Sequence, residues 1–257
     1  MTLNEQLISF NTIVVREVRR FMRIWIQTIL PAAVVSGLYF IIFGKILGTM
    51  ITDINGIRYI DFIIPGVILM TVIQNSYSNV VSSFYSAKFH NNVEELLISP
   101  TPNYVILLGY TAGGVARGVT VGIAVVIVSL VFTTLKIHNI AVLLSVIVLT
   151  SVLFSMAGFI NAVYAKSFDD ISIVPTFVLT PLIYLGGVFY DLNALPPFWQ
   201  KVAQFNPILY MVNAFRYGFI QATDVSLTAS YSIILLFIFA LFWYSLWLLK
   251  RGTGLRT

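Results

Sequence analysis

Two adjacent carboxylates, Glu94 and Glu95, lie in the stretch NNVEELLISPTP of a 257-residue chain that has only ten Asp and Glu residues. Paired carboxylates could act as an acid and a base if their side chains converged on one point. In a helix, however, neighbouring residues point about 100° apart and do not face each other. The pair is therefore not expected to form a catalytic site, and another role has to explain it.

Other residue types that carry chemistry are scarce in this sequence. The chain has no cysteine, which excludes thiol catalysis, thiolate metal sites and disulfides. Its two histidines, His90 and His138, are far apart in the sequence, so a histidine metal site is not expected. No G-x-x-x-x-G-K-S/T motif occurs, so the chain itself is expected to bind neither ATP nor any other cofactor. We expect a protein that is not an enzyme.

The composition predicts an integral membrane protein. Hydrophobic residues make up 58% of the chain, charged residues only 10%, and the mean hydropathy is +0.92. A soluble domain has about 25% charged residues. Long apolar stretches such as IAVLLSVIVLTSVLFSMAGFINAVY predict helices, because a helix satisfies its own backbone hydrogen bonds in lipid. The net charge of +5 does not indicate nucleic-acid binding, since the basic residues cluster at the ends of the apolar segments. We expect an all-α membrane protein with a single domain over residues 1–257.

Six segments are expected to span the membrane, which takes about 20 apolar residues each. They run approximately over 25–43, 60–84, 104–132, 140–164, 171–190 and 226–249. Residues 3–23, before the first span, have an amphipathic helical pattern. The apolar face carries Leu7, Phe10, Val14, Val18, Phe21 and Trp25. The polar face carries Glu5, Ser9, Thr12, Arg16, Arg20 and Arg23. This pattern is typical of a helix in the membrane interface; the alternative is a solvated beginning of the first span.

The distribution of basic residues predicts the orientation, because cytoplasmic loops carry more Lys and Arg. With six spans, both termini lie on one side of the membrane. That side receives Arg16, Arg19, Arg20, Arg23, Lys88, Lys166, Lys250, Arg251 and Arg256. The other side receives Lys45, Arg58, Lys136, Lys201 and Arg216. Both termini are therefore expected in the cytoplasm, and Arg117 is assigned to neither side.

The stretch 88–100, which holds the two glutamates, is then a cytoplasmic connection. Either asparagine of NNVEELL can cap a short helix with both acids in its first turn, and the prolines of SPTP end it. Leu96, Leu97 and Ile98 are apolar although they lie in a loop. A short helix with projecting apolar residues is suited to dock in a groove of a partner protein; the alternative is a solvated loop.

The stretch 191–216, on the outward side, is too broken by proline to span and too apolar for an ordinary loop. Its prolines are Pro196, Pro197 and Pro207, and its aromatic residues include Phe198, Trp199, Phe205 and Tyr210. Re-entrant short helices before the last span are the expected structure; the alternative is a folded loop that caps the bundle.

The third span carries a stripe of small residues and one charge. Its glycines are Gly109, Gly113, Gly114, Gly118 and Gly122. They allow close helix packing, either within the chain or in a dimer. Arg117 lies about 13 residues, or about 20 Å, into the span. It is expected near the interface, where its side chain can reach polar surroundings; the alternative is that it lines a polar path.

Together these segments resemble the type-2 ABC exporter permeases. The motifs that carry the resemblance are RFMRIWIQT, NNVEELLISP, FDDISIVPTFVLTPLIYLGGVFY, LPPFWQ with the following NP and R, and RGTGL. The resemblance covers essentially the whole chain. It implies a bacterial inner-membrane location, a homodimer of permease chains, and two ABC ATPase subunits that bind ATP and Mg below them.

In that family, a coupling helix in the first cytoplasmic loop sits in a groove of the ATPase. The resemblance carries this role onto Asn92, Glu94, Glu95, Leu96, Leu97 and Ile98. It implies a second ATPase contact through Glu17, Arg19, Arg20 and Arg23 of the interface helix. The substrate path is implied between the two chains, along the first, second and fifth spans. Aromatic residues that could line it are Tyr39, Phe40, Tyr77, Tyr184 and Phe189.

The leading hypothesis is therefore the membrane subunit of an ATP-driven exporter that moves a hydrophobic or amphipathic substrate outward. The alternative is a stand-alone channel or an ion-coupled secondary transporter, which needs an ion site inside the membrane. No intramembrane acid is found for it. A membrane enzyme would need clustered His, Asp or Glu at one interface, where the sequence offers only Asp169 and Asp170. The sequence does not define the substrate.

Overall fold

Helices make up the regular structure of the computed structural model, which describes residues 1–49, 53, 54, 56–252 and 254. Within these residues, the only strand-like pairing is a single bridge between Ile54 and Ile57. The α-helices are α1 (Leu3–Arg23), α2 (Trp25–Thr28), α3 (Leu30–Tyr39), α4 (Tyr59–Phe89), α5 (Asn92–Ile98), α6 (Asn103–Ser129), α7 (Ile140–Tyr164), α8 (Asp170–Val174), α9 (Thr180–Leu185), α10 (Pro197–Gln204), α11 (Pro207–Ile220) and α12 (Leu227–Arg251). Two π-helical segments, Phe40–Ile46 and Pro175–Leu179, and two 3₁₀ turns, Leu47–Thr49 and Leu192–Ala194, extend or link them. The expected all-α fold is confirmed for the described residues.

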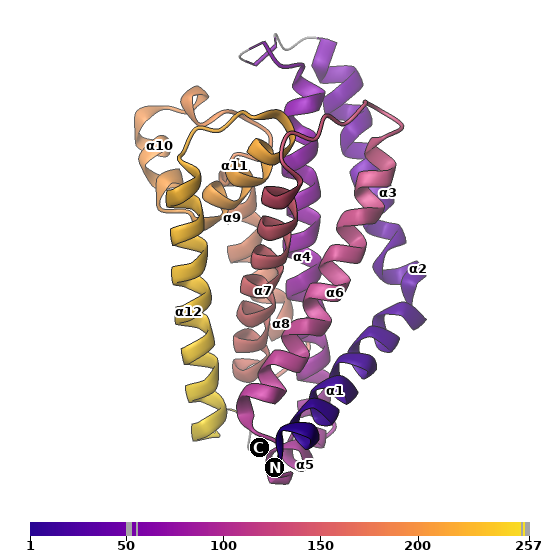
Figure 1. Cartoon of the computed structure of the whole chain (residues 1–257). Coiled ribbons are helices and arrows are strands. Elements are labelled where there is room, and N and C mark those ends of the chain that lie inside the picture. The colour runs from indigo at the N-terminus through magenta and orange to yellow at the C-terminus, as the bar shows by residue number, and fades with distance from the viewer. Residues whose placement is uncertain (50–52, 55, 253, 255–257) are drawn as a thin grey trace.

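Five helical segments are long and apolar enough to cross a membrane. They are Trp25–Gly44, Tyr59–Phe89, Asn103–Ser129, Ile140–Tyr164 and Leu227–Arg251. The first consists of α2, α3 and the beginning of the π-helical segment that follows them. These segments run along the long axis of the molecule (Figure 1). Each corresponds to one of the spans expected from the apolar runs of the sequence.

The expected span 171–190 is shorter and broken. It corresponds to the apolar segment Asp170–Leu185, which is shorter than the other five segments. Pro175 and Pro181 lack the N–H that continues an α-helix. Between them the backbone winds as a π-helix, in which the N–H of Thr180 donates to the carbonyl of Pro175. Gly187 then follows in a left-handed conformation, which glycine adopts without strain. A sixth span of full length is therefore not confirmed.

The stretch 191–216 forms short helices, as the prolines predict. Pro197 and Pro207 occupy the first turns of α10 and α11, where a missing N–H costs no helical hydrogen bond. Asn206 caps α11 by accepting the N–H of Ile208 at 3.0 Å. Whether these helices enter a membrane from the outer side stays a prediction.

The bundle has two distinct ends. The beginning of α1, the whole of α5 and the end of α12 lie together at one end, which we call the α5 end (Figure 1). The beginning of α4 lies at the opposite end with α10 and α11, and we call this the α10 end. The first and last helices of the chain therefore meet the same end of the bundle.

α4 forms the centre of the bundle. Its residues Ile63, Ile64, Val67 and Ile68 have no exposed surface, because α3, α6, α7 and α11 all pack against this helix. A helix that is apolar on all sides is expected to be buried in this way. Any polar residue on α4 must therefore find its partners inside the protein.

The glycine stripe on α6 is filled by helices of the same chain. A β-carbon at Gly109 would lie 2.7 Å from Ile13 of α1, and one at Gly113 would lie 2.5 Å from Glu17. The other three glycines of the stripe face side chains of α4 and α7 at similarly short distances. Small residues permit this close approach of helices. The stripe therefore serves packing within the chain, which leaves it unavailable to a second copy.

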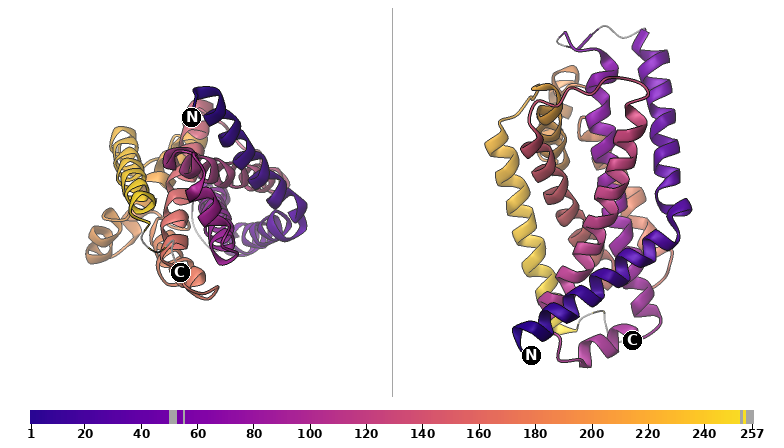
Figure 2. Two further views of the ribbon diagram at one scale, coloured as in Figure 1. Left: turned by 90° about the horizontal axis from the view of Figure 1, so that it is seen from below. Right: turned by 45° about the vertical axis from the view of Figure 1, so that its right-hand side comes forward.

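α1 crosses the α5 end diagonally before the chain enters the bundle (Figure 2). A reciprocal capping box between Thr2 and Glu5 begins the helix. The helix is interrupted at Ile24, and α2 then starts a new direction. The amphipathic segment and the first span are thus two separate helices, as the sequence pattern predicts.

The buried side of α1 differs from the expected apolar face. Ile13, Glu17 and Phe21 form the buried row, while Leu7 and Trp25 of the expected face are 62% and 50% exposed. α1 therefore packs on the bundle through a row that contains a carboxylate. Phe21 belongs to the expected face, and Phe10, Val14 and Val18 of that face are half-buried, so the face is turned only partly away from the bundle. A position of α1 in the membrane interface stays a prediction.

Gly158 of α7 offers a test of this packing. A β-carbon there would lie 2.5 Å from the backbone oxygen of Tyr77 in α4, which cannot move without displacing the helix. Gly158→Ala is expected to lower the apparent Tm of the detergent-solubilised protein, with an overpacking cost of about 1–3 kcal/mol. Gly37→Ala is the matched control, because its β-carbon would meet nothing closer than 3.6 Å. Equal Tm values for both variants would contradict the packing of α4 on α7.

Candidate functional site

A sharp turn at the α5 end separates α4 from α5. Asn91 makes this turn in the left-handed conformation, with a φ of 60°, and its side chain forms no cap. Asn91 is thus the N-cap residue of α5, as one of the two expected asparagines, but the expected side-chain hydrogen bond is missing. Asparagine is suited to this position because it tolerates left-handed backbone better than most residues. α5 ends at Ile98, where the hydroxyl of Ser99 donates to the carbonyl of Leu96. The two prolines follow, as expected.

α5 is anchored on one side and free on the other. Val93 is only 2% exposed, and Leu96 packs against the hydrophobic core. Glu94 and Glu95 are exposed, and Ile98 is 85% exposed. A helix held by two apolar residues that projects two carboxylates and an isoleucine presents a surface to something outside the chain.

Two further residues of the expected coupling helix can be placed in α5. Asn92 is its first residue and is exposed. Leu97 belongs to the helix, but its side chain lies outside the described part of the structure. The exposed surface of α5 therefore rests on Asn92, Glu94, Glu95 and Ile98.

Glu17 is buried, with 1% of its surface exposed, where α1 meets α4 and α6. Its carboxylate accepts a hydrogen bond from Ser83 at 2.7 Å and pairs with Arg20 at 3.2 Å and Arg16 at 3.4 Å. Arg20 also donates to the side-chain oxygen of Asn79 at 2.8 Å and to its backbone carbonyl at 3.0 Å. A buried charge requires such partners because its removal from water is costly. We call these five residues the Glu17 cluster.

Burial changes the role of Glu17. The family resemblance implied that Glu17 contacts an ATPase, but its carboxylate is enclosed and occupied within the chain. Arg20 is engaged in the same cluster, whereas Arg19 and Arg23 are exposed. Arg16 extends the cluster to α6 by donating to the hydroxyl of Tyr110 at 2.7 Å. The cluster therefore fastens α1 to the bundle, and Glu17 is removed from the set of candidate partner contacts.

A row of polar residues continues from this cluster along α4. Thr71, Asn75, Asn79 and Ser83 recur at every fourth position, so they lie on one side of the helix. Asn79 and Ser83 belong to the Glu17 cluster, and Thr71 and Asn75 line a cavity further along α4. This row is absent from the sequence-based expectations, although an i, i+4 spacing of polar residues in an apolar helix is a visible signal.

The cavity has a volume of about 470 Å³ and lies among α2, α3, α4 and the segment Pro175–Thr180. Gln27, Thr28, Gln74 and Ser78 contribute to its polar lining. We call it the mid-bundle cavity. The first, second and fifth of the expected spans thus meet around a polar hollow that is open on one side, since its lining residues Gln27, Val35 and Thr176 are exposed.

Arg117 of α6 lines the same cavity. Its Nε and Nη2 donate to the side-chain oxygen of Asn75 at 3.3 and 3.1 Å. Arg117 follows the first residue of α6, Asn103, by 14 positions, which is about 21 Å along a helix. Its guanidinium stays at the level of Asn75 in the middle of α4 and does not extend to the end of the helix. Of the two alternatives for Arg117, the structure shows the lining of a polar space.

Five aromatic residues were expected along the substrate path, and the structure separates them. Tyr39, Tyr184 and Phe189 gather between the first and fifth expected spans. The hydroxyls of Tyr39 and Tyr184 are 3.2 Å apart, and the ring centroids of Tyr39 and Phe189 are 5.6 Å apart. Phe40 and Tyr77 are enclosed in the hydrophobic core, with 0% and 2% of their surface exposed. These two residues are therefore excluded from a path, because the rotation of their helices turns them inward.

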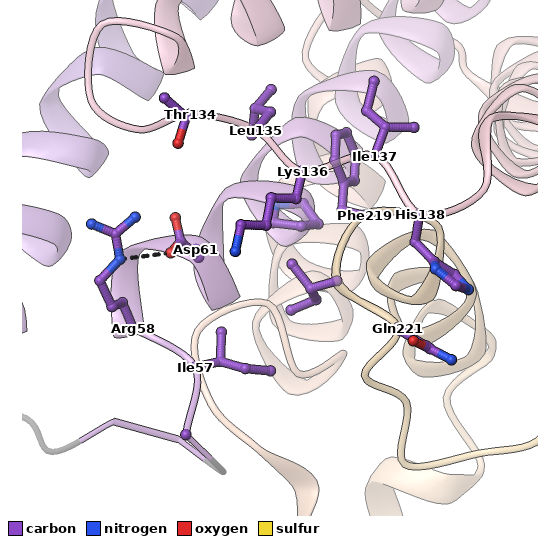
Figure 3. A pocket seen from close by; sticks show the side chains of 13 residues that line it. Ile57, Arg58, Asp61, Thr134, Leu135, Lys136, Ile137, His138, Phe219 and Gln221 are labelled. Carbon is purple, nitrogen blue, oxygen red and sulfur yellow. Dashed lines mark hydrogen bonds and ion pairs between the residues drawn. The ribbon is translucent and has the colours of Figure 1, made fainter.

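A second cavity, of about 700 Å³, lies at the α10 end (Figure 3). The beginning of α4, the connection from α6 to α7 and the end of α11 enclose it. Arg58 pairs with Asp61 at 2.8 Å and donates to Thr133 at 3.1 Å. The backbone N–H of His138 donates to the carbonyl of Gly218 and holds the connection against α11. Three segments therefore surround this cavity, and the positive charge of Arg58 is already paired with the carboxylate of Asp61.

Arg216 fixes α11 at the α10 end. It is 1% exposed, and it donates to the carbonyl of Gly187 at 2.6 Å and to that of Phe62 at 3.3 Å. Its guanidinium also lies 3.8 Å from the ring centroid of Phe62. In the connection after α11, burial raises the pKa of Asp224, and neighbouring Asp191 raises it further. These contacts join α4 and α11 to the turn at Gly187 that follows α9, so the role of Arg216 is structural.

A membrane-crossing bundle, a polar cavity among three spans and a short helix projecting at one end describe a membrane transport subunit. Among the described residues, no group of three or more His, Cys, Asp or Glu could hold a metal ion. The family model described as ABC-2 type transporter matches residues 8–220. The chain therefore belongs to the ABC-2 type transporter family and is a membrane-spanning permease of that family.

Individual relatives agree with the family. The chain is 52% identical over 250 residues to the inner membrane transport permease YadH of Escherichia coli strain K12, a match that covers 97% of this chain and 98% of that protein. It is 23% identical over 239 residues to nodulation protein J of Neorhizobium galegae, covering 91% of each. It is 24% identical over 218 residues to nodulation protein J of Sinorhizobium fredii, covering 84% of this chain and 82% of that protein. The resemblance of the sequence to the type-2 permeases is confirmed.

The Glu17 cluster can be tested by removing one charge. Glu17→Gln leaves Arg16 and Arg20 without their acid and is expected to lower the apparent Tm, with a cost of about 2 kcal/mol for the lost charge-assisted hydrogen bonds. Glu94→Gln, which changes an exposed carboxylate of the same size, is expected to leave the Tm unchanged. A lowered Tm for Glu94→Gln with a native Tm for Glu17→Gln would show that the cluster does not hold α1.

Proposed function

We propose that the chain is the membrane-spanning subunit of an ATP-driven exporter whose separate ATPase subunit, in two copies, binds ATP and Mg. Two permease chains form the membrane unit as a homodimer, and the substrate moves outward between them. Membership of the ABC-2 permease family supports the ATPase partner, because this chain shows no P-loop motif of its own.

The exposed face of α5 carries the proposal. Glu94, Glu95 and Ile98 project from the end of the bundle although an isoleucine gains free energy from burial. A short helix with an apolar residue and charged neighbours suits a groove on another protein. Arg19 and Arg23, in the second half of α1, are exposed and line one hollow with Asn92, the first residue of α5. α1 itself crosses this end of the bundle (Figure 2). The two arginines provide a second contact of opposite charge to the same partner.

The connection from α5 to the cavity provides the mechanical step. Val93 and Leu96 hold α5 in the core, and only the turn at Asn91 separates it from α4. A displacement of α5 is therefore passed to α4, which lines the mid-bundle cavity through Thr71 and Asn75. Closure of the two ATPase subunits on ATP pushes α5, shifts α4 and opens the path outward.

The proposed topology has six crossings, with the short segment Asp170–Leu185 as the fifth. Both termini and α5 lie in the cytoplasm, α1 lies in the membrane interface, and α10 and α11 re-enter from the outer side. The shared end of the first and last helices supports this arrangement (Figure 1). The location is the inner membrane, as in the name of the Escherichia coli relative.

The transported substrate is amphipathic in this proposal. The mid-bundle cavity offers hydroxyl and amide groups, such as those of Thr28 and Gln74. The aromatic rings of Tyr39, Tyr184 and Phe189 lie between the first and the fifth expected spans, which also line this cavity. A polar headgroup on an apolar body matches this lining better than a wholly apolar molecule.

A stand-alone channel or ion-coupled transporter is less well supported. Coupling to protons or sodium ions requires ionisable groups inside the membrane, usually acids. No Asp, Glu or His is among the described residues that line the mid-bundle cavity. The exposed face of α5 also has no role in a transporter that works alone.

The role of α5 can be tested in the complex with the native ATPase. Ile98→Asp, and separately Glu94→Lys with Glu95→Lys, are expected to reduce ATP hydrolysis by the reconstituted complex about tenfold. That reduction corresponds to about 1.4 kcal/mol of lost coupling energy. Lys201→Glu, a charge reversal at an exposed position of α10, is the matched control and is expected to keep native hydrolysis. Membrane insertion of each variant is checked by its yield in the membrane fraction.

Two outcomes would contradict the proposal. One is that no P-loop ATPase purifies with the tagged native chain. The other is that both α5 variants keep native hydrolysis and native binding of the ATPase.

A further inference from the structure

We propose that the mid-bundle cavity binds an anionic amphiphile with a hydroxylated headgroup, and that Arg117 contacts the anionic group. Where this amphiphile is taken to be the exported cargo, the inference rests on the proposed function. It narrows the cargo from amphipathic molecules in general to those that carry a negative charge.

Arg117 has hydrogen-bonding capacity to spare. A guanidinium has five N–H donors, and the contacts found in the described residues are those of Nε and Nη2 to one oxygen of Asn75, at 3.3 and 3.1 Å. Arg117 takes part in none of the three ion pairs found among the described residues. Its guanidinium lines the cavity and therefore keeps donors that a ligand can reach.

The cost of this charge also needs an explanation. An arginine within a membrane-spanning helix is expensive and normally faces a polar partner or a pathway. Asn75 is neutral and does not cancel the charge of Arg117. A packing role alone would be filled at lower cost by an amide, since Gln in place of Arg117 could also donate to Asn75. The positive charge itself is therefore the property to be explained, and an anion in the cavity explains it.

The remaining lining defines the rest of the ligand. Gln27, Gln74, Ser78 and Thr180 offer hydroxyl and amide groups on several sides of the cavity, which suit a headgroup with several hydroxyls. Apolar residues such as Val35, Met70 and Leu179 share the lining, which suits an attached apolar chain. The volume of about 470 Å³ lies within the range of small-molecule sites.

The cavity at the α10 end contains an arginine without this spare capacity, beside the exposed Lys136. Its Arg58 is paired with Asp61 at 2.8 Å, and Thr133 also accepts a hydrogen bond from it. An anion at that place would compete with an acid that is already bound. Arg58 is therefore the natural control for a variant at Arg117.

The test measures binding to the purified full-length permease in phosphatidylcholine nanodiscs, without any ATPase. Octyl β-D-glucuronide and octyl β-D-glucoside share the chain and most hydroxyls and differ in the carboxylate, so their dissociation constants isolate the charge. The native chain is expected to bind the glucuronide with a dissociation constant about tenfold or more below that of the glucoside. One charge-assisted hydrogen bond accounts for a difference of this size. Arg117→Gln is expected to reduce this preference below about threefold, Arg117→Lys to restore part of it, and Arg58→Gln to leave it intact.

Equal affinity of the native chain for both probes overturns the inference, whether or not any variant folds. A full preference in Arg117→Gln overturns it as well, provided that this variant elutes as the native protein does. Since no ATPase is present, this result is independent of the test of α5. If the α5 variants contradict docking on an ATPase while the native chain still prefers the glucuronide, the exporter proposal fails and the anion site is retained.

A further arm distinguishes the source of the anion. Nanodiscs that contain phosphatidylglycerol present a hydroxylated anionic headgroup from the bilayer itself. If phosphatidylglycerol abolishes glucuronide binding to the native chain but not the residual binding to Arg117→Gln, the site takes a bilayer phospholipid. If binding to the native chain is unaffected, the site takes an anionic amphiphile supplied from elsewhere. Either result supports an anion at Arg117.

Discussion

A single buried carboxylate determines how the α5 end of this permease is built. Glu17 is stable inside the protein only because Arg16, Arg20 and Ser83 surround it. These contacts fix the rotation of α1 about its axis and its position along α4 and α6. Gly113 completes the fit, since any larger residue would meet the side chain of Glu17. The amphipathic helix is thus attached through a row that combines Ile13 and Phe21 with the charged Glu17, and Leu7 at its beginning stays on the outside.

α4 links this attachment to the rest of the mechanism. One polar row on α4 holds the Glu17 cluster through Asn79 and Ser83 and reaches the mid-bundle cavity through Asn75. α5 follows α4 after a single left-handed turn. α4 therefore carries the attachment of α1 and part of the cavity lining, and one turn joins it to α5, the proposed docking helix. In the proposed mechanism, a force on α5 passes through this turn and along α4 to the cavity.

The sequence predicts the elements better than it predicts their rotation. Apolar runs are long and local, so five spans and the short helix α5 could be located from them, and Pro175 and Pro181 show why the remaining segment is broken. Burial of Glu17 could not be foreseen, because its partner Ser83 lies 66 positions away and an amphipathic pattern assigns every charge to the outside. Phe40 and Tyr77 turn inward for the same reason: neighbouring helices set which side of a span is buried. The i, i+4 row of polar residues on α4 could be seen in the sequence. Its role could not be predicted, because Asn75 of this row contacts Arg117 of another helix.

Site-specific photocrosslinking from α5 can show whether this helix contacts an ATPase. The native chain has no cysteine, so a single cysteine in place of Ile98 can carry a benzophenone maleimide at a position that is 85% exposed. Phe205→Cys, 88% exposed and just after α10, is the control from the opposite end. We expect a crosslink between Ile98→Cys and a P-loop ATPase in membranes of the native host, and none from Phe205→Cys. A crosslink to the ATPase from Phe205→Cys, or no crosslink from Ile98→Cys in a complex that still contains the ATPase, would show that α5 does not dock on the ATPase.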